Sequence, residues 1–310
     1  MPHPHPHAAR SFSRGLAVSF TAGAMLAGLL AAGSAQAQHA KFVLLEDADT
    51  PDQPAEHTAV HPLTAPYANG DAFVTTDVRP WFVYHDFPDS SAIDGGSAKA
   101  YAAQLRLALT NELQLVAYKD GYTDFDSGLV DEEGWNDAAA GLKWKVLEDW
   151  EHQLHGAMGA GYEAKTGDSR VLSNDDEWRL FGSLNKGFDR LHLGATGNVF
   201  LKTGDQGAFG DADRTSWHLH ADYRVNRWFS PVVEVNGYHT FNEGTAALPF
   251  QGVDLANLGG GEDEDVITAA AGAEFRFNEA VSLRGAYELP VTSNDDLFGY
   301  RWTFSAVWSF

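Results

Sequence analysis

The last twelve residues of the chain, GYRWTFSAVWSF at positions 299–310, decide the fold. Large apolar side chains alternate in this stretch with polar or small ones. Successive side chains of a β-strand point to opposite faces, so a period of two predicts a strand with one apolar face. The apolar face consists of Tyr300, Trp302, Phe304, Ala306, Trp308 and Phe310.

The same alternation recurs from residue 72 onward, and tight turns such as Asn111-Glu112 alternate with long connections such as 243–265. Strands of about 10–13 residues can cross a bilayer at the tilt of a barrel. The pattern therefore predicts an all-β transmembrane antiparallel up-and-down β-barrel with short periplasmic turns and longer extracellular loops. The twelve predicted strands are 72–86, 99–110, 113–125, 135–147, 153–166, 177–188, 191–203, 215–226, 230–242, 266–278, 281–292 and 300–310.

A soluble β-sandwich is the alternative fold for a chain of short strands and turns. A sandwich does not normally place a tight hairpin at every second connection, and an edge strand with this many aromatic residues would invite aggregation. A final strand that closes on Phe310 also resembles the signal read by the barrel-assembly machinery of the outer membrane. We therefore predict a barrel with that machinery, outer-membrane lipids and lipopolysaccharide as its partners.

The charge of the chain narrows its function. Its 310 residues include 43 Asp and Glu against 21 Lys and Arg, a formal net charge of −22. Nucleic-acid binding needs basic side chains to neutralise phosphates, so we predict no nucleic-acid partner. The chain has no cysteine, which excludes disulfides, thiolate metal sites and cysteine nucleophiles.

The N-terminus has the pattern of a cleaved signal peptide. Arg10 and Arg14 precede an apolar run that ends in Ala35-Gln36-Ala37, so we predict a signal peptide over residues 1–37 and export of the mature chain. A transmembrane anchor is the alternative, but alanine and glycine dilute the run. Residues 38–71 carry four prolines together with Glu46, Asp47, Asp49, Asp52 and Glu56, and the proline spacing excludes a long helix. We predict a periplasmic arm or a plug that enters the lumen, and a disordered leader fits equally well.

The polar face of each predicted strand lines the lumen if the aromatic face meets lipid. This parity places most basic residues inside the barrel, while acidic residues gather in the loops and the arm. A basic pore favours anionic solutes, although Arg and Glu neighbours could instead brace the barrel. The predicted lumen lining and solute path consists of Arg106, Arg179, Arg224, Arg276, Arg284, Arg301, Lys143, Glu274, Glu288 and Tyr238.

Catalytic and metal-binding patterns are weak in this sequence. The histidine nearest to a hydrolase pattern is His239, which has Asn242 but no serine beside it and falls on the lipid-facing parity. His218 and His220 share the inward face, but no third metal ligand is specified. The acidic loop 259–265 lacks the EF-hand spacing, so we interpret it as a solvated loop. We predict no enzyme activity, no cofactor and no metal.

Several short motifs in the second half of the chain resemble one family. They are AAGLKW at 139–144, GAGYEAKTGD at 159–168, GNVF at 197–200, AGAEFRF at 271–277, YELPVT at 287–292 and GYR at 299–301. They resemble the phenol-degradation meta-pathway outer-membrane β-barrel family over about residues 135–310. The resemblance implies a porin-like channel or transporter for aromatic or other small organic compounds, without catalytic residues to transfer.

These observations lead to one functional prediction and two alternatives. We predict an outer-membrane channel that passes small hydrophilic or amphipathic solutes, anionic or aromatic, by diffusion through a polar, Arg-lined lumen. A barrel-embedded lipid or lipopolysaccharide hydrolase is the first alternative. A sealed structural barrel that binds a partner is the second.

Overall fold

The computed structural model describes residues 38–49, 51, 53–91, 93–171, 176–203, 212–244, 252–254, 256–261, 265–293 and 297–310. The predicted signal peptide and the central part of the acidic loop, 262–264, lie outside these residues. None of the helices in the described residues is long and apolar enough to cross a membrane.

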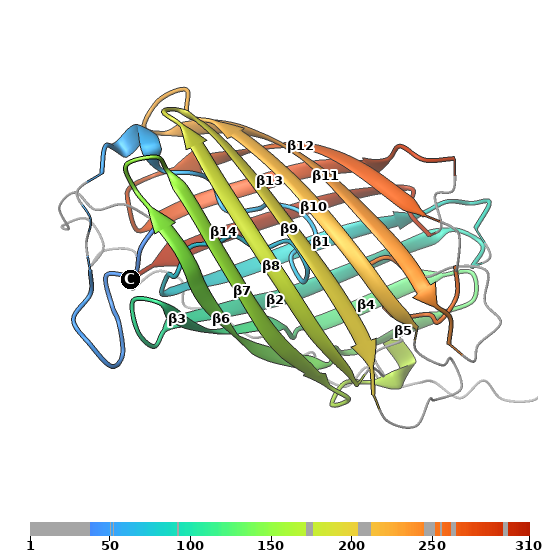
Figure 1. Cartoon of the computed structure of the whole chain (residues 1–310). Helices are drawn as coiled ribbons and strands as arrows, with labels where there is room; N and C mark the ends of the chain where they lie inside the picture. Colours follow the sequence, from blue (N-terminus) through green and yellow to red (C-terminus); the bar gives the residue numbers. More distant parts are fainter. Residues whose placement is uncertain are drawn as a thin grey trace, which may run out of the picture. The chain divides into compact units, whose positions relative to one another are not determined.

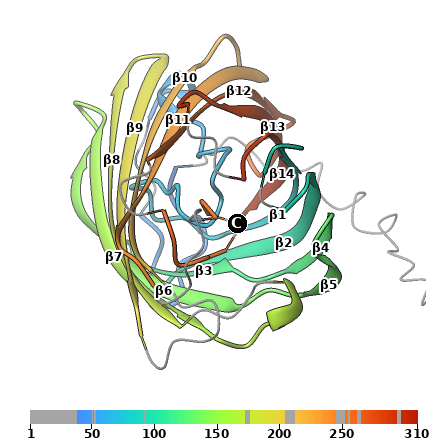
Figure 2. The ribbon, with the colours of Figure 1, turned by 90° about the vertical axis from the view of Figure 1, so that its right-hand side faces the viewer.

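The described residues contain fourteen strand segments in one antiparallel sheet, and this sheet is closed because β1 pairs with both β2 and β14. Figures 1 and 2 show the resulting barrel from the side and along its axis. The segments are β1 (Asp77–Phe87), β2 (Gly96–Ala108), β3 (Leu113–Lys119), β4 (Tyr122–Ser127), β5 (Asp131–Trp135), β6 (Ala138–Asp149), β7 (Leu154–Ala164), β8 (Glu177–Phe188), β9 (Leu191–Lys202), β10 (Asp213–Tyr223), β11 (Phe229–Asn242), β12 (Val266–Arg276), β13 (Val281–Pro290) and β14 (Tyr300–Ser309). Two short 3-10 helices, η1 (Ala55–His57) and η2 (Ser169–Val171), accompany them.

The fourteen segments make twelve barrel strands, as the sequence predicts. Strands β3 and β4 both pair with β2, and β4 pairs with β5 while β3 pairs with β6, so β3–β4 and β5–β6 are two interrupted strands. The first interruption lies at Gly121, whose φ of 121° suits glycine and where a Cβ would lie 2.4 Å from the carbonyl oxygen of Tyr101. The first strand begins at Asp77 rather than at residue 72.

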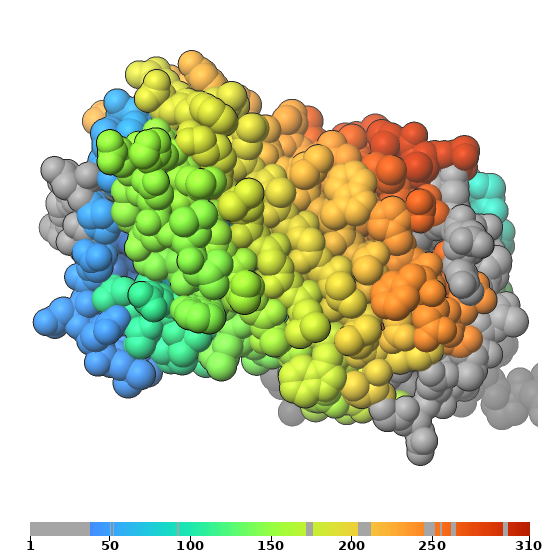
Figure 3. Space-filling view, viewed as in Figure 1, coloured from blue at the N-terminus to red at the C-terminus, as the bar shows by residue number. Residues whose placement is uncertain are grey.

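The outer wall of the barrel is apolar and its inner wall is polar. Leu193, Leu219 and Phe304 point outward with 41–49% of their surface exposed, whereas the neighbouring His192 and Thr303 are buried. A water-soluble protein would bury such large apolar side chains, so this surface is suited to contact with lipid chains. Figure 3 shows the outer wall as a continuous surface formed by side chains of successive strands.

A charge on the outer wall is expected to destabilise the barrel. Leu219 lies in the middle of β10, opposite Ala195 and Val235, and is 49% exposed. We expect Leu219→Arg to lower the free energy of unfolding from lipid vesicles by about 2–4 kcal/mol, because a guanidinium would enter hydrocarbon. Leu129→Arg is the control, since Leu129 is 71% exposed in the connection between β4 and β5. Equal unfolding free energies for the two variants in urea titrations would contradict a membrane-facing wall.

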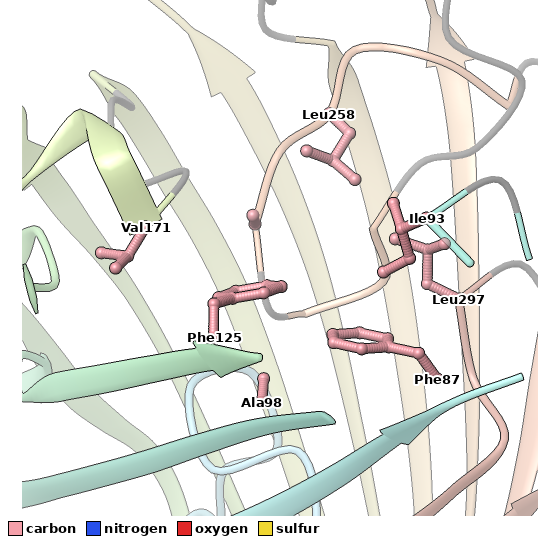
Figure 4. Close-up of a cluster of buried hydrophobic side chains, with 8 residues drawn as sticks. Phe87, Ile93, Ala98, Phe125, Val171, Leu258 and Leu297 are labelled. Atoms are coloured by element: carbon pink, nitrogen blue, oxygen red, sulfur yellow. The ribbon is translucent and has the colours of Figure 1, made fainter. Parts of the chain in front are cut away.

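The two ends of the barrel differ. Tight turns, such as the one after β8, lie at the end that holds the C-terminus, and the long connections lie at the opposite end (Figure 1). At the loop end, residues from the strands and from several connections pack into a hydrophobic cluster (Figure 4). The cluster is formed by Phe87, Ile93, Ala98, Phe125, Val171, Ala256, Leu258 and Leu297.

Candidate functional site

The segment before β1 contacts the tight-turn end of the barrel and then enters the lumen. Residues 38–49, which we call the strap, pair with the barrel end: the amide of Lys41 donates to the carbonyl of Phe310, and the amide of Leu44 donates to the carbonyl of Ala108. Residues 58–74, which we call the plug, are mostly buried and contact side chains from the inner wall. In the axial view of Figure 2 the plug occupies the interior of the ring of strands.

Carboxylates of the inner wall bind the first half of the plug through its backbone. The amide of Val60 donates to Asp222 at 3.0 Å, and the amides of Leu63 and Thr64 donate to Glu234 at 2.9 and 2.7 Å. His220 lies between these two acids, with its ring nitrogens 3.2 Å from Asp222 and 2.7 Å from Glu234. His220 therefore bridges the two acids that bind the backbone of the plug.

Basic residues of the inner wall bind the carbonyl groups of the plug. The guanidinium of Arg179 donates to the carbonyls of Tyr67 and Ala68 at 2.7 and 2.6 Å. Arg284 donates to the carbonyl of His61 at 3.1 Å. These bonds use carbonyl groups that a plug without regular secondary structure would otherwise bury unpaired.

Asp71 is the charged centre of the plug. Its carboxylate lies 3.0 Å from Arg106, 3.4 Å from Lys143 and 3.7 Å from Arg79. Within the plug, the ring nitrogen Nδ1 of His61 lies 2.8 Å from the same carboxylate. Burial alone would raise the pKa of the Asp71 carboxyl, but Lys143 and the other positive charges hold it well below its usual range. Asp71 therefore stays ionised and ties the plug to three strands of the wall.

The surroundings of His61 predict that docking of the plug is sensitive to acid. Burial and the positive charge of Arg79 lower the pKa of His61 to about 4, despite its hydrogen bond to Asp71. Asp77 also faces this ring from β1, and Arg284 contacts the carbonyl of the same residue from β13. A displaced plug would take up a proton near the ordinary pKa of about 6.5. Protonation between pH 6.5 and 4 therefore favours displacement.

We expect plug docking to weaken by up to about 3 kcal/mol as the pH falls from 7 to 4. The docked plug holds His61 neutral, so the stability that this gives is fully present above the pKa of the free histidine and is lost as the pH falls towards the lowered pKa. The folded carboxylate of Asp71 adds a further loss below about pH 4. Single-channel recordings at several pH values measure this as a rising open fraction. His61→Gln should remove the rise in open fraction between pH 7 and pH 4. An open fraction of the native protein that does not change with pH would refute this role of His61.

The structure buries all ten residues predicted to line the lumen, with exposed fractions of 9% or less. Six of them contact the plug, five through hydrogen bonds or ion pairs and Tyr238 through packing, and the others pair with one another or with a loop, as Arg276 does with Glu274 and Arg301 with Glu288. Tyr238 packs with Ala65 of the plug. The five that bind the plug through polar contacts are Arg106, Arg179, Arg224, Arg284 and Lys143.

Sequence reasoning missed two acids that organise this site. Asp71 follows Gly70 at the end of the plug, and Asp254 comes from the long connection between β11 and β12. Asp254 accepts from the guanidinium of Arg301 at 2.6 and 3.1 Å, and Arg301 holds the pKa of this carboxyl below its usual range against the effect of burial. Neither acid belongs to an alternating segment, so no periodic signal in the sequence identifies it.

The three singled-out histidines have hydrogen-bond partners on the wall. His218 bonds Ser216 and Asn236, and His220 bonds the two acids described above. His239 lies on the outer side, where one ring nitrogen faces Asp265 and the other accepts from Trp217. No group of three or more His, Asp or Glu side chains in the described ranges is arranged to hold a metal ion.

Among the described residues, four small cavities adjoin the plug, with volumes of about 20, 30, 20 and 20 Å³. Each has room for about one water molecule. Val253 of the long β11–β12 connection packs against Ala65 of the plug from the loop end of the barrel. The described residues therefore place the plug and a folded-in loop in contact across the lumen.

Comparisons with known proteins give likenesses of low identity. No family model and no curated protein matches the chain, so the resemblance to the phenol-degradation family is not confirmed. Among solved structures, the NanC porin is similar at 11% identity and a TM-score of 0.48, with 76% of this chain and 99% of that chain covered. The KdgM porin has 11% identity, a TM-score of 0.45 and coverages of 76% and 99%. LpxR from Salmonella typhimurium has 8% identity, a TM-score of 0.43 and coverages of 76% and 100%. With TM-scores below 0.5, none of these likenesses carries an argument.

Proposed function

We propose that the chain is an outer-membrane transporter in which the barrel is the path and the plug is the gate. Small anionic or aromatic solutes would cross when the plug leaves its contacts with the wall. The tight turns would face the periplasm and the long connections the cell exterior, after removal of residues 1–37 during export. Lipids, lipopolysaccharide and the barrel-assembly machinery would be its partners.

The observation that carries this proposal is the chemistry of the interface between plug and wall. The plug is held in part by hydrogen bonds and ion pairs, such as those of Arg179, Arg284 and Asp71, which water or a solute can replace. Apolar contacts, such as that of Leu63 with Val232, add to them. In an apolar interface of the same size, neither water nor a polar solute could replace the lost contacts, because the stability of such an interface comes from the exclusion of water. The same guanidinium groups that bind plug carbonyls could then bind an anionic solute.

The charge of the inner wall supports an anionic solute. Among the described residues, ten buried basic side chains of the wall and its strand ends face eight buried acids, so the wall keeps an excess of positive charge when the plug is away. A positive lining attracts anions and repels cations. The acids are Asp77, Asp137, Glu163, Glu177, Asp222, Glu234, Glu274 and Glu288, and the bases are Arg79, Arg106, Lys119, Lys143, Arg179, Arg214, Arg224, Arg276, Arg284 and Arg301.

Aromatic side chains near the plug tip support an aromatic solute. Tyr67, Trp81 and Phe125 line one of the small cavities together with the cations of Lys119 and Arg301. An aromatic ring with a carboxylate or phenolate group would find both stacking surfaces and positive charge at this position. Displacement of the plug would have to enlarge the cavity before such a ring could enter.

Conductance in planar bilayers tests the proposal. We expect the full-length protein to show rare openings, and the reversal potential of open events in a potassium chloride gradient to indicate anion preference. Arg179→Gln and Arg284→Gln should shift the reversal potential towards cations, while Arg170→Gln in the exposed η2 segment is the control. Absence of any conductance, or open events with cation preference in the native protein, would contradict a basic solute path.

The hydrolase alternative is not favoured by the surroundings of His239. A general base needs a free ring nitrogen facing a nucleophile, and the Nε2 of His239 accepts a hydrogen bond from Trp217 at 2.7 Å instead. The sealed-barrel alternative differs from the transporter in one respect, which is whether the plug moves. That difference is tested by tethering the plug to the wall.

A further inference from the structure

One of the small cavities lies between the plug and the part of the wall formed by β1, β2, β13 and β14. It has a volume of about 20 Å³, which is enough for one water-sized occupant. Asn69 of the plug, Trp81 of β1, Arg106 of β2 and Thr303 of β14 line it. The cavity therefore lies where the plug meets neighbouring strands of the wall.

Each of these four side chains has a buried polar atom without a hydrogen-bond partner. The atoms are Asn69 Nδ2, Trp81 Nε1, Arg106 Nε and Thr303 Oγ1. The four residues are only 2–7% exposed, so bulk water does not satisfy them. The three nitrogens can only donate hydrogen bonds, and the threonine hydroxyl can donate as well. Buried donors without acceptors are costly, so the cavity is suited to an occupant that accepts hydrogen bonds from several directions.

The charges around the cavity are unbalanced. In the described residues, four basic side chains converge on this part of the interface and two carboxylates face them. The adjacent pair of Arg276 and Glu274 adds one charge of each sign and leaves the excess unchanged. The basic residues are Arg79, Arg106, Lys143 and Arg284, and the acids are Asp71 and Asp77.

We propose that this cavity binds one small monovalent anion of the size of chloride, and that the anion fastens the plug to the wall. A neutral water molecule accepts about two hydrogen bonds and must also donate its own, so it would leave donors unpaired and the positive charge uncompensated. A halide ion accepts from all four groups and supplies the missing negative charge. This proposal does not depend on whether the barrel transports a solute, because the anion would bind to the docked plug alone.

Thermal unfolding of the full-length protein in detergent tests the site with chloride as the probe. We expect the Tm to be about 2–4 °C higher in sodium chloride than in sodium gluconate of equal ionic strength, because gluconate exceeds the volume of the cavity. The rise should saturate with chloride concentration, and bromide should reproduce it. The same Tm in both salts for the native protein would overturn the proposal.

Two variants separate the anion site from a general salt effect. Trp81→Phe removes one donor together with the five-membered ring of the indole, so its readout is the difference in Tm between the two salts, which should be smaller than in the native protein. Asn69→Asp places a carboxylate at the cavity and should give a Tm that no longer depends on chloride. If Trp81→Phe does not fold, Asn69→Asp still tests the site, and a full chloride response in Asn69→Asp would count against it.

Crystals grown in bromide give the direct measurement. The proposal predicts an anomalous peak within hydrogen-bond distance of the Nε atom of Arg106. A cavity that contains water, without anomalous signal, in crystals grown in bromide would overturn the assignment.

Discussion

Asp71→Asn is expected to release the plug and to convert rare openings into a largely open barrel. The substitution keeps the size of the side chain but removes the charge that lies 3.0 Å from Arg106 and 3.4 Å from Lys143. Removal of one partner of a buried ion pair typically costs about 3–5 kcal/mol, because the other charges remain buried without compensation. A cost of about 3 kcal/mol changes the ratio of docked to displaced plug by about two orders of magnitude.

The measurement is the open fraction of single channels together with the Tm of the purified protein. The open fraction should rise about a hundredfold while the barrel remains folded, since the wall strands keep their own hydrogen bonds. Asp47→Asn is the matched control, because Asp47 lies in the exposed part of the strap and loses no ion pair among the described residues. An unchanged open fraction in Asp71→Asn would show that the plug is not held by this charge or does not close the path.

The barrel was predictable because a period of two is a local property of the sequence. Each predicted strand carries its own alternation, so the inward position of Arg179 and Arg301 follows from parity alone. The interruption at Gly121 was not predicted, because it results from a close approach to the backbone of β2.

The plug was not predictable in detail because its contacts are mainly with its backbone. Every residue has an amide and a carbonyl, so nothing in the sequence indicates that Val60 meets Asp222 or that Tyr67 meets Arg179. The apolar residues 72–74 were predicted as the start of a strand. Instead, Ala72 and Phe73 bond Asn185 and Lys143 of the wall through their backbone, and the carbonyl of Val74 accepts from Ala40 of the strap. Long-range contacts decided the outcome at this point, not local preference.

Tethering the plug to the wall is expected to abolish conductance. A Cβ placed on Gly70 of the plug would lie 3.5 Å from the hydroxyl oxygen of Ser183 on β8, which brings the two positions within the reach of a disulfide. The chain has no cysteine, so Gly70→Cys with Ser183→Cys creates a single possible bond. Oxidation would then fix the plug beside Arg179, and reduction would release it without any other change in the molecule.

The controls for the tether are the two single-cysteine variants and the native protein, each recorded with and without a reducing agent. None of them can form the intramolecular bond, so none should respond to reduction. The Tm of the oxidised double variant should be at or above that of the reduced form, which would show that the barrel itself is intact.

Conductance of the Gly70→Cys/Ser183→Cys protein in a planar bilayer, before and after reduction, tests the gate most directly. A plug that must leave the wall predicts silence in the oxidised form and the return of anion-preferring openings on reduction. Openings of equal frequency and size in the oxidised and reduced forms would contradict it, because a solute would then pass while the plug stays in place.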